Sequence, residues 1–399
     1  MNPAPPDSAT RSRPVRWLAC VLAGIAILTY PYIDLSVAIP IASWHMNAPV
    51  GDIAVSLLIA VVAADALLTR RAPLPLPGWI GYAVLVVAGM LALPAAIDAH
   101  ASLHTLVRKV IFSWIAYGGA IALVVARVLP DVWLRRLVRA SLTTVALLSL
   151  ATSLGRILAG NTLWFSAIEG LTNNHKTLAV AMAPVAVLAW SWRGRLDRGV
   201  AALAFVAIAL SLSRTAWIAS AVGICFFVVV RGRPLANRHG VLPAVVVFGF
   251  LVATYGPILS GSVTQFDALR SRHSLDRRAW EMFAAHPIVG MGAGSGVLVV
   301  QETFPDYRVN GVETHGVVQK VGSEHGLVGL LGYALFFGAM ARRVRSHHHD
   351  GNGVWPTFLA LHANLLLSTE AFTLTHWLPL GLVWGLAHRD VPPDGNRPP

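Results

Sequence analysis

Long apolar runs, separated by short polar breaks, fill most of the chain. Several of them approach the ~20 residues that a helix needs to cross a hydrocarbon layer of ~30 Å. The pattern therefore predicts an all-α integral membrane protein, with about twelve transmembrane helices in a single membrane domain over residues 1–399. The predicted spans cover residues 17–38, 52–69, 78–97, 109–126, 138–157, 177–192, 199–213, 215–230, 240–258, 325–341, 354–370 and 376–388.

Composition supports a membrane protein and argues against a soluble one. Of the 399 residues, 55% are hydrophobic and 13% are charged, whereas soluble domains typically contain about 25% charged residues. Cys20 and Cys225, the two cysteines, both lie inside apolar runs, so neither a disulfide framework nor a cysteine metal site is expected. The first apolar run begins at Trp17 and lacks a small-residue cleavage site, which indicates a retained first span.

The net charge of +12 would suggest a nucleic acid partner in a soluble chain, but in a membrane protein the position of each cation matters more. Lys and Arg are retained on the cytoplasmic side. With both termini cytoplasmic, the inner loops hold all but 11 of the 31 basic residues. The inner set is Arg11, Arg13, Arg16, Arg70, Arg71, Arg127, Arg135, Arg136, Arg139, Arg193, Arg195, Arg198, Arg231, Arg233, Arg238, Arg342, Arg343, Arg345, Arg389 and Arg397.

The 11 remaining cations lie on the outer side, against this rule. They are Arg108, Lys109, Arg156, Lys176, Arg214, Arg270, Arg272, Arg277, Arg278, Arg308 and Lys320. A solvated loop surface accounts for several of them. Arg214 is different, because the segment SLSRTAW between the seventh and eighth spans predicts a tight turn at the membrane edge, where an unpaired guanidinium costs a few kcal/mol. Pairing with headgroups, with a loop carboxylate or with a bound anion all remain open.

One large outer loop is predicted, over residues 259–314, between the ninth and tenth spans. Helical spacing of apolar residues predicts an amphipathic helix on the outer membrane surface, and these residues are Leu275, Ala279, Met282 and Phe283. The helix should end before His286-Pro287, because the residue before a proline avoids the α region. Four glycines at alternate positions from Gly290 to Gly296 predict a flexible stretch whose N–H groups can approach a ligand.

The segment ETHGVVQKVGSEHGLVGLLGYALFF, residues 313–337, begins polar and becomes apolar. If a helix begins at His315, small or polar residues follow it along one side, which would let another helix pack closely. These are Gln319, Gly322, Gly326 and Gly329. His315 would then stand at the outer mouth of the tenth span, where an imidazole can exchange protons near neutral pH. A lone histidine is more often structural, so its neighbours matter.

These motifs resemble the bacterial O-antigen ligase and polymerase superfamily. In HGVVQKVGSEHGLVG the matching positions are His315, Glu324, Gly326 and Gly329, while Gly316 stands where the family usually has Asn, Ser or Gln. In SRHSLDRRAWEMFAAHPIVGMGAG the matching positions are Arg272, His286, Pro287, Gly290 and Gly292. SLSRTAW, with Arg214, resembles another family motif, and LTNNHKTLA, with Asn174 and Lys176, resembles it weakly.

The resemblance implies a GT-C-like glycosyltransferase of the bacterial inner membrane. Such enzymes move a glycan from undecaprenyl pyrophosphate to an acceptor hydroxyl on the periplasmic side, without a cofactor or metal and without a nucleic acid partner. It implies that Arg214 and Arg272 hold the diphosphate and that His315 is the general base. Arg277, Arg278 and Lys176 are expected to assist in binding the pyrophosphate or the acceptor. Direct displacement of this kind inverts the anomeric centre.

Several functions remain open at this point. A ligase that attaches O-antigen to lipid A–core is favoured slightly, because there is one large outer loop. An O-antigen polymerase uses the same chemistry with another acceptor, and a protein O-glycosyltransferase usually carries a further soluble region. A secondary transporter is the alternative from another class; it would place its binding residues near the bilayer midplane, where Asp65 and His362 are predicted.

Overall fold

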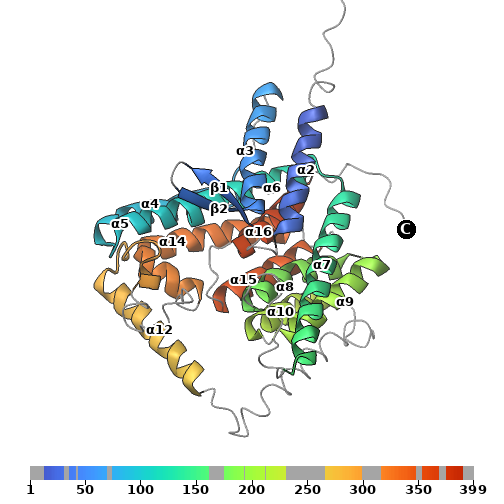
Figure 1. Ribbon diagram of the computed structural model, residues 1–399. Coiled ribbons are helices and arrows are strands. Elements are labelled where there is room, and N and C mark those ends of the chain that lie inside the picture. The colour runs from blue at the N-terminus through green and yellow to red at the C-terminus, as the bar shows by residue number, and fades with distance from the viewer. Residues whose placement is uncertain are drawn as a thin grey trace, which may run out of the picture.

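The chain folds as an array of helices, with one small hairpin near the amino end (Figure 1). The computed structural model describes residues 13–30, 36–41, 44–69, 74–160, 175–192, 194–211, 213–230, 266–298, 316–346, 353–367 and 374–389. The α-helices are α2 (Arg13–Thr29), α3 (Val50–Thr69), α4 (Trp79–Leu91), α5 (Ala99–Thr105), α6 (Ile121–Arg127), α7 (Asp131–Leu158), α8 (His175–Ser191), α9 (Arg195–Leu210), α10 (Arg214–Val230), α12 (Phe266–Ala285), α14 (Val317–Ser346), α15 (Val354–Leu367) and α16 (Leu374–Ala387).

Three shorter helices complete the set. A 3₁₀ turn, η1 (Leu93–Ala95), follows α4. Two π-helical segments, η2 (Leu106–Phe112) and η3 (Trp114–Ala120), join α5 to α6. Because these elements follow one another directly, residues 99–127 form one helical run, and it starts ten residues before the fourth predicted span.

The prediction of a helical membrane protein is confirmed. Every predicted span contains a helix except 240–258, which lies outside the described residues. Within the described residues, four helical segments are long and apolar enough to cross a membrane: Val50–Leu67, Ala99–Arg127, Asp131–Gly155 and Val317–Ser346. Shorter apolar helices accompany them, including Trp79–Leu91 and Val354–Leu367. This is a multi-pass membrane protein; the count of about twelve crossings remains a prediction.

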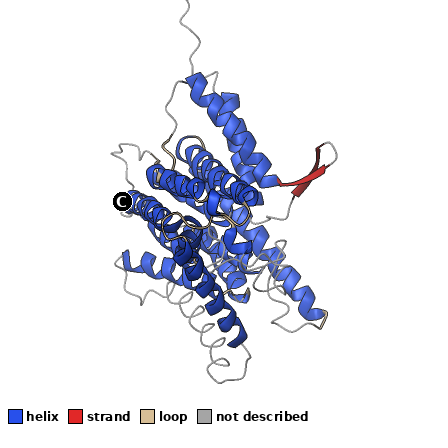
Figure 2. Ribbon diagram, turned by 90° about the vertical axis from the view of Figure 1, so that its left-hand side faces the viewer, coloured by secondary structure: helices blue, strands red, loops and turns tan. Residues whose placement is uncertain are grey.

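The first predicted span is wrong at its end. Helix α2 stops at Thr29, and residues 36–38 belong to the strand β1 (Ser36–Ile41). This strand pairs antiparallel with β2 (Trp44–Pro49), from Ser36 opposite Pro49 to Ile41 opposite Trp44. The β-branched residues of β1 favour a strand, and its proline disfavours helix. Figure 2 shows the hairpin standing to one side of the helices.

Helices α8 and α10 both run antiparallel to α15. The Asn364 side-chain amide donates to the Val180 carbonyl oxygen over 2.8 Å, which joins the carboxyl half of α15 to the amino half of α8. The Thr215 hydroxyl donates to the Leu367 carbonyl oxygen over 3.4 Å, which joins the start of α10 to the last residue of α15. Two helices therefore begin where α15 ends.

Helix α14 begins at the same place. A Cβ atom added to Gly316 would lie 2.7 Å from the Leu366 carbonyl oxygen, while farther along the two helices the Phe337 and Phe358 rings are 5.6 Å apart. So α14 is also antiparallel to α15. We call the region where α8, α10 and α14 begin and α15 finishes the convergent end.

Helices α4 and α14 lie side by side (Figure 1) and pack closely through glycines. A Cβ atom added to Gly81 would lie 2.5 Å from the Gly332 carbonyl oxygen, and one added to Gly332 would lie 2.7 Å from that of Gly81. Near the other end of the contact, Gly89 faces the His325 ring. Small residues let the two backbones approach, and the order of contacts makes α4 finish at the end where α14 begins.

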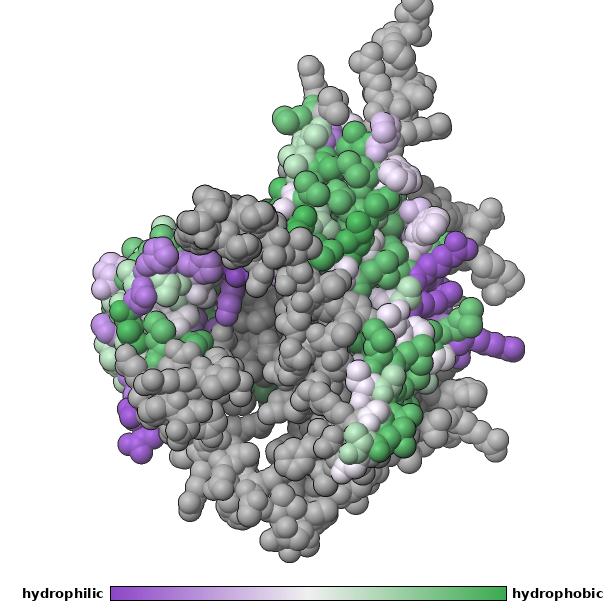
Figure 3. All heavy atoms as spheres, in the orientation of Figure 1, coloured by the Kyte–Doolittle hydropathy of each residue, from purple (hydrophilic) through white to green (hydrophobic). Residues whose placement is uncertain are grey.

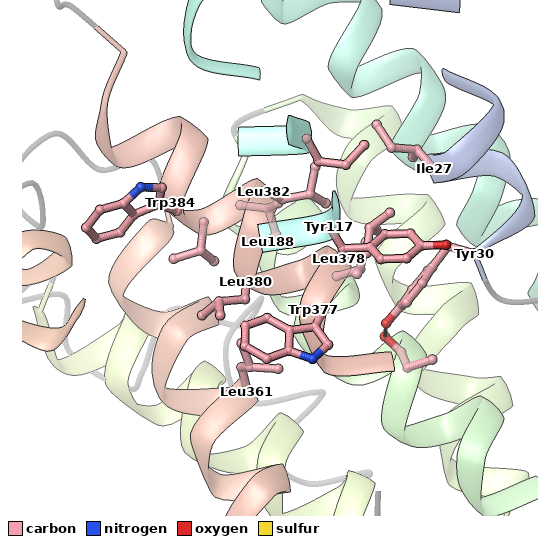
Figure 4. Packing of buried hydrophobic residues seen from close by; sticks show 14 of the residues in the cluster. Ile27, Tyr30, Tyr117, Leu188, Leu361, Trp377, Leu378, Leu380, Leu382 and Trp384 are labelled. Atoms are coloured by element: carbon pink, nitrogen blue, oxygen red, sulfur yellow. Dashed lines mark hydrogen bonds between the residues drawn. The ribbon is translucent and has the colours of Figure 1, made fainter. Parts of the chain in front are cut away.

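The interior is one large hydrophobic cluster with a few internal polar contacts. Figure 4 shows part of it, where side chains from α2, η3, α15 and α16 meet around Trp377. The Tyr30 hydroxyl donates to the Ala181 carbonyl oxygen over 3.2 Å, and the Tyr117 hydroxyl donates to Asp52 Oδ1 over 2.6 Å. These polar atoms are therefore satisfied inside an apolar core, as burial requires.

At the end opposite to the convergent end, a buried carboxylate joins α7 to α9. Asp197 is fully buried; its Oδ1 accepts a hydrogen bond from Arg139 Nε over 2.5 Å, and its Oδ2 lies 3.9 Å from Arg135 Nη1. Removing one member of a buried ion pair leaves the other without compensation. This pair is therefore expected to matter for stability more than a surface ion pair would.

We expect Asp197→Ala to lower the free energy of unfolding by about 3 kcal/mol, because the Arg139 guanidinium loses its buried partner. Thermal unfolding of the purified protein in detergent measures this effect. Arg195→Ala, at an exposed position of the same helix, is the matched control and should unfold near the wild-type temperature. Equal behaviour of the two variants would show that the buried pair does not stabilise the fold.

Candidate functional site

The turn before α10 places Arg214 as the first residue of that helix. The Ser211 hydroxyl donates to the Ile208 carbonyl oxygen over 2.6 Å and accepts from the Ser213 N–H over 3.2 Å. The buried Trp217 indole donates to the same Ile208 carbonyl oxygen over 2.9 Å. These bonds explain why SLSRTAW forms the tight turn that was predicted. As a backbone position, Arg214 lies at the convergent end.

Two other predicted site residues belong to the same end by chain position. Lys176 is the second residue of α8, so its backbone lies in the first turn of a helix that begins there. His315 lies just outside the described residues, but it is bonded to Gly316, and successive Cα atoms are about 3.8 Å apart. The structure thus brings the backbone positions of Lys176 and Arg214, at the starts of two helices, to one end of the protein, together with Gly316, the chain neighbour of His315.

The start of α14 differs from the prediction. The helix begins at Val317, and Gly316 adopts the left-handed conformation with φ of +89°. Because Gly316 also lies against the Leu366 carbonyl oxygen, a residue with a Cβ atom would be strained there and would overlap α15. His315 therefore precedes the helix, and the glycine after it, unusual for the family, has a structural reason.

The predicted small-residue stripe along α14 is interrupted at Gly326, where φ is 63° and ψ is −160°. This break is filled by the loop after α12. The Leu327 and Val328 N–H groups donate to the Pro287 and Ile288 carbonyl oxygens over 2.8 and 3.1 Å. In return, the Met291 and Gly292 N–H groups donate to the Ser323 and Glu324 carbonyl oxygens, both over 2.9 Å. We call residues 286–292 together with residues 322–328 the socket.

The socket explains why two separate motifs are needed. A break in a helix leaves N–H and C=O groups without partners, and inside a protein such groups must be paired elsewhere. The loop carrying His286-Pro287 supplies those partners to the helix carrying Gly326-Leu327-Val328-Gly329. A Cβ atom on Gly326 would overlap the Ile288 carbonyl, and one on Gly290 would overlap the backbone of Glu324. The two motifs form a single structural unit.

The glycines after His286 have a different structural role from the one predicted. Gly290, Gly292 and Gly294 have φ values of 77°, 90° and 80°, which other residues rarely adopt. Added Cβ atoms on Gly292 and Gly294 would lie 2.6 Å from Ser102 Oγ and 2.9 Å from Thr105 Oγ1. These glycines bring the loop against the protein's own helices instead of leaving a flexible stretch open to a ligand.

The amphipathic helix predicted in the large loop is confirmed as α12. It ends at Ala285, directly before His286-Pro287, and its buried side chains are Leu275, Ala279 and Met282. Its exposed side carries Arg277 and Arg278, which bind Glu281 over 3.0 and 2.6 Å. The Arg278 and Arg277 guanidiniums hold the pKa of the Glu281 carboxyl below its usual range.

Arg272 belongs to the amino-terminal half of α12, away from the socket. The joint between α12 and α14 is near Phe283, since a Cβ atom added to Gly322 would lie 3.6 Å from the Phe283 ring. Eleven residues of helix separate Arg272 from Phe283, which corresponds to roughly 16 Å along the axis. The convergence of Arg272 with Arg214 is therefore still a prediction.

Comparison with known proteins addresses part of this region. Residues 199–334 match the profile of a protein family described as O-antigen ligase. This match supports the resemblance to the O-antigen ligase and polymerase superfamily. The match runs from α9 into α14 and contains Arg214, Arg272, the socket and His315. It does not distinguish a ligase from a polymerase. A search of curated proteins found no match.

A group of buried polar side chains lies on α14 between the convergent end and the break. Lys320, Ser323, Glu324 and His325 are all at most 4% exposed. A Cβ atom added to Gly296 would lie 3.3 Å from Glu324 Oε1, and one added to Gly89 would lie 3.0 Å from His325 Cε1. The sequence analysis did not single out His325. The polar cluster KVGSEH at the start of an apolar helix is the sequence feature that could have indicated His325.

Among the described residues, no group of three or more His, Cys, Asp or Glu side chains is arranged to hold a metal ion.

Proposed function

We propose that this protein transfers a glycan from undecaprenyl pyrophosphate to an acceptor hydroxyl at the convergent end, facing the periplasm from the inner membrane. One observation carries the proposal: α8, α10 and α14 begin where α15 ends, so Lys176, Arg214 and the residue before Gly316 gather at one end of apolar helices. The reacting bond of the carrier lies at headgroup level, while its polyprenyl tail stays in the bilayer. A site with polar residues at the end of apolar helices suits such a substrate.

Electrostatics at this end favour an anion. Helix amino termini carry partial positive charge and unpaired N–H groups, and both attract phosphate. Arg214 adds a guanidinium, which can grip phosphate oxygens with paired hydrogen bonds. In the proposed site Arg214 and Arg272 stabilise the departing diphosphate, while Lys176, Arg277 and Arg278 assist in binding the donor or a phosphorylated acceptor.

His315 is proposed as the general base. It takes the proton of the acceptor hydroxyl as the oxygen attacks the anomeric carbon. The bond from that carbon to the carrier phosphate breaks, and the diphosphate leaves with the electron pair. Because attack and departure occur on opposite faces of the sugar, the product has the inverted configuration. The proposed step needs neither nucleotide nor metal.

The favoured acceptor is lipid A–core, which makes the protein an O-antigen ligase. The family match supports a polymerase equally, with a second carrier-linked glycan as acceptor. Purified protein should be incubated with undecaprenyl-pyrophosphate glycan and either acceptor, without added nucleotide or metal. Glycosylated lipid A–core identifies a ligase, and a lengthened carrier-linked glycan identifies a polymerase. Absence of product with both acceptors would contradict the proposal and favour the transport alternative.

We expect Arg214→Ala to reduce the transfer rate by about 10² to 10³, because one well-aimed donor to developing charge contributes that much. Arg214→Lys should recover part of the rate, since it keeps the charge and loses the paired geometry. Initial rates at saturating donor measure both. A full rate in Arg214→Ala would mean that this guanidinium does not face the reacting phosphate.

A further inference from the structure

The helical run from α5 into η2 presents basic side chains on one surface. His100, His104, Arg108 and Lys109 are all exposed. In the α-helical part, His104 lies one turn after His100. At Leu106 the run becomes π-helical, and in the wider turn the residues four and five positions after His104 both lie about one turn along from it. Arg108 and Lys109 therefore continue the row, which we call the basic stripe.

The opposite side of this run is held by the socket loop and by α4. Ser102 and Thr105 face Gly292 and Gly294, and Leu106 lies against Gly89. These contacts fix the rotation of the run and direct the basic stripe outward. Because α4 finishes at the end where α14 begins, and α5 follows α4, the stripe lies at the same end of the protein as the proposed site.

Apolar side chains lie among these cations. Ile97, Leu103 and Val107 are 42%, 39% and 49% exposed. Figure 3 shows hydrophilic and hydrophobic atoms side by side at the end of the molecule where α5 lies in Figure 1. A soluble polyanion would gain nothing from contact with these apolar side chains. A lipid would, because its headgroup contacts the basic side chains while its acyl chains contact the apolar ones.

We propose that the basic stripe binds the anionic, phosphate-bearing headgroup of a lipid in the leaflet at the convergent end. The Arg108 guanidinium matches phosphate oxygens with paired donors, Lys109 adds a point charge, and each imidazole offers an N–H donor. None of the four residues of the stripe belongs to the site proposed around Arg214, Arg272 and His315. Which leaflet it faces rests on the proposed function; the binding itself does not.

Lipid binding by the detergent-purified protein tests this proposal, with native mass spectrometry to count bound lipid against lipid concentration. Phosphatidylglycerol is the anionic probe and phosphatidylcholine the zwitterionic one. A cation near an anionic headgroup strengthens binding about fivefold, so R108A/K109A should weaken phosphatidylglycerol binding roughly 25-fold. R108K/K109R, which keeps both charges, should bind almost as the wild type does and shows that the run is folded.

The matched control is R195A/R198A, which removes two cations from the opposite end, at the start of α9. It should bind phosphatidylglycerol like the wild type. The proposal is overturned if R108A/K109A binds like the wild type, if the control loses as much, or if inorganic phosphate displaces the lipid at equal concentration. No glycan donor is present, so loss of lipid binding and loss of transfer are separate results.

Discussion

Replacement of His315 by alanine is expected to reduce glycan transfer by about 10² to 10⁴, the usual contribution of a general base. The protein should still insert and unfold like the wild type, because the role proposed for His315 is in the chemical step. Single-turnover transfer from undecaprenyl-pyrophosphate glycan measures the chemical step directly. The pH–rate profile is the sharper readout, since loss of the base should remove its acid limb.

The control for this experiment is an arginine at the far end of the protein. Arg195→Ala changes charge by one unit on an exposed turn of α9 and should leave the rate and the pH profile unchanged. If purified His315→Ala protein transferred glycan at the wild-type rate, the assignment of the base would be wrong. The site proposed around Arg214 would then need another proton acceptor, and the buried Glu324 and His325 would be the next to examine.

Gly326→Ala is the second substitution with a large expected effect. The backbone conformation at Gly326 is one that other residues adopt only at a cost of about 1 to 3 kcal/mol, and the new methyl group would overlap the Ile288 carbonyl. The loop would have to move, with loss of the hydrogen bonds that join it to Leu327 and Val328. We expect a lower unfolding temperature and a transfer rate reduced by at least tenfold.

Gly338→Ala is the matched control because it lies on the same helix and a Cβ atom added there would meet nothing within 4 Å. It should be neutral or slightly stabilising, since alanine favours helix more than glycine does. The pair of variants separates the socket from a general effect of alanine on α14. Wild-type stability and activity in Gly326→Ala would mean that the break and its loop are dispensable.

The socket links the stability of α14 to the geometry of the proposed site. Its loop pairs with the backbone on both sides of Gly326, and it also packs against the run that carries the basic stripe. The first ten residues of α14, with Lys320, Glu324 and His325 buried on them, are thus held from several directions. A rigid support of this kind is what positions a catalytic group within the small tolerance that transfer requires.

Sequence patterns located the helices well, and for a simple reason. In a membrane, each backbone N–H and C=O must be paired within its own segment, so a long apolar run is a helix with few alternatives. That is why α3, α10 and α15 lie where the apolar runs predicted. The end of α12 before His286-Pro287 was equally readable, because proline restricts the residue before it.

Other features could not be read from local patterns. The strand β1 follows α2 after a short segment in which Asp34 is the one charged residue, so its first residues looked like a continuation of the first span. The break at Gly326 follows the polar residues Ser323, Glu324 and His325, and η2 contains Arg108 and Lys109, but polar residues do not by themselves indicate a changed backbone. In each case the backbone partner comes from a residue distant in sequence or from a changed register, and periodicity carries no information on either.

For the candidate site, too, some features could be predicted from the sequence and others only from the tertiary structure. The sequence by itself determined which residues are unusual, and it predicts cations on the outer side, a histidine at the mouth of a span and glycines at motif spacing. Whether such residues meet depends on how helices pack. Only the tertiary structure brought the starts of α8, α10 and α14 to the end of α15 and joined the two motifs at Gly326, because interhelical contacts are set by shape complementarity between segments that no local pattern records.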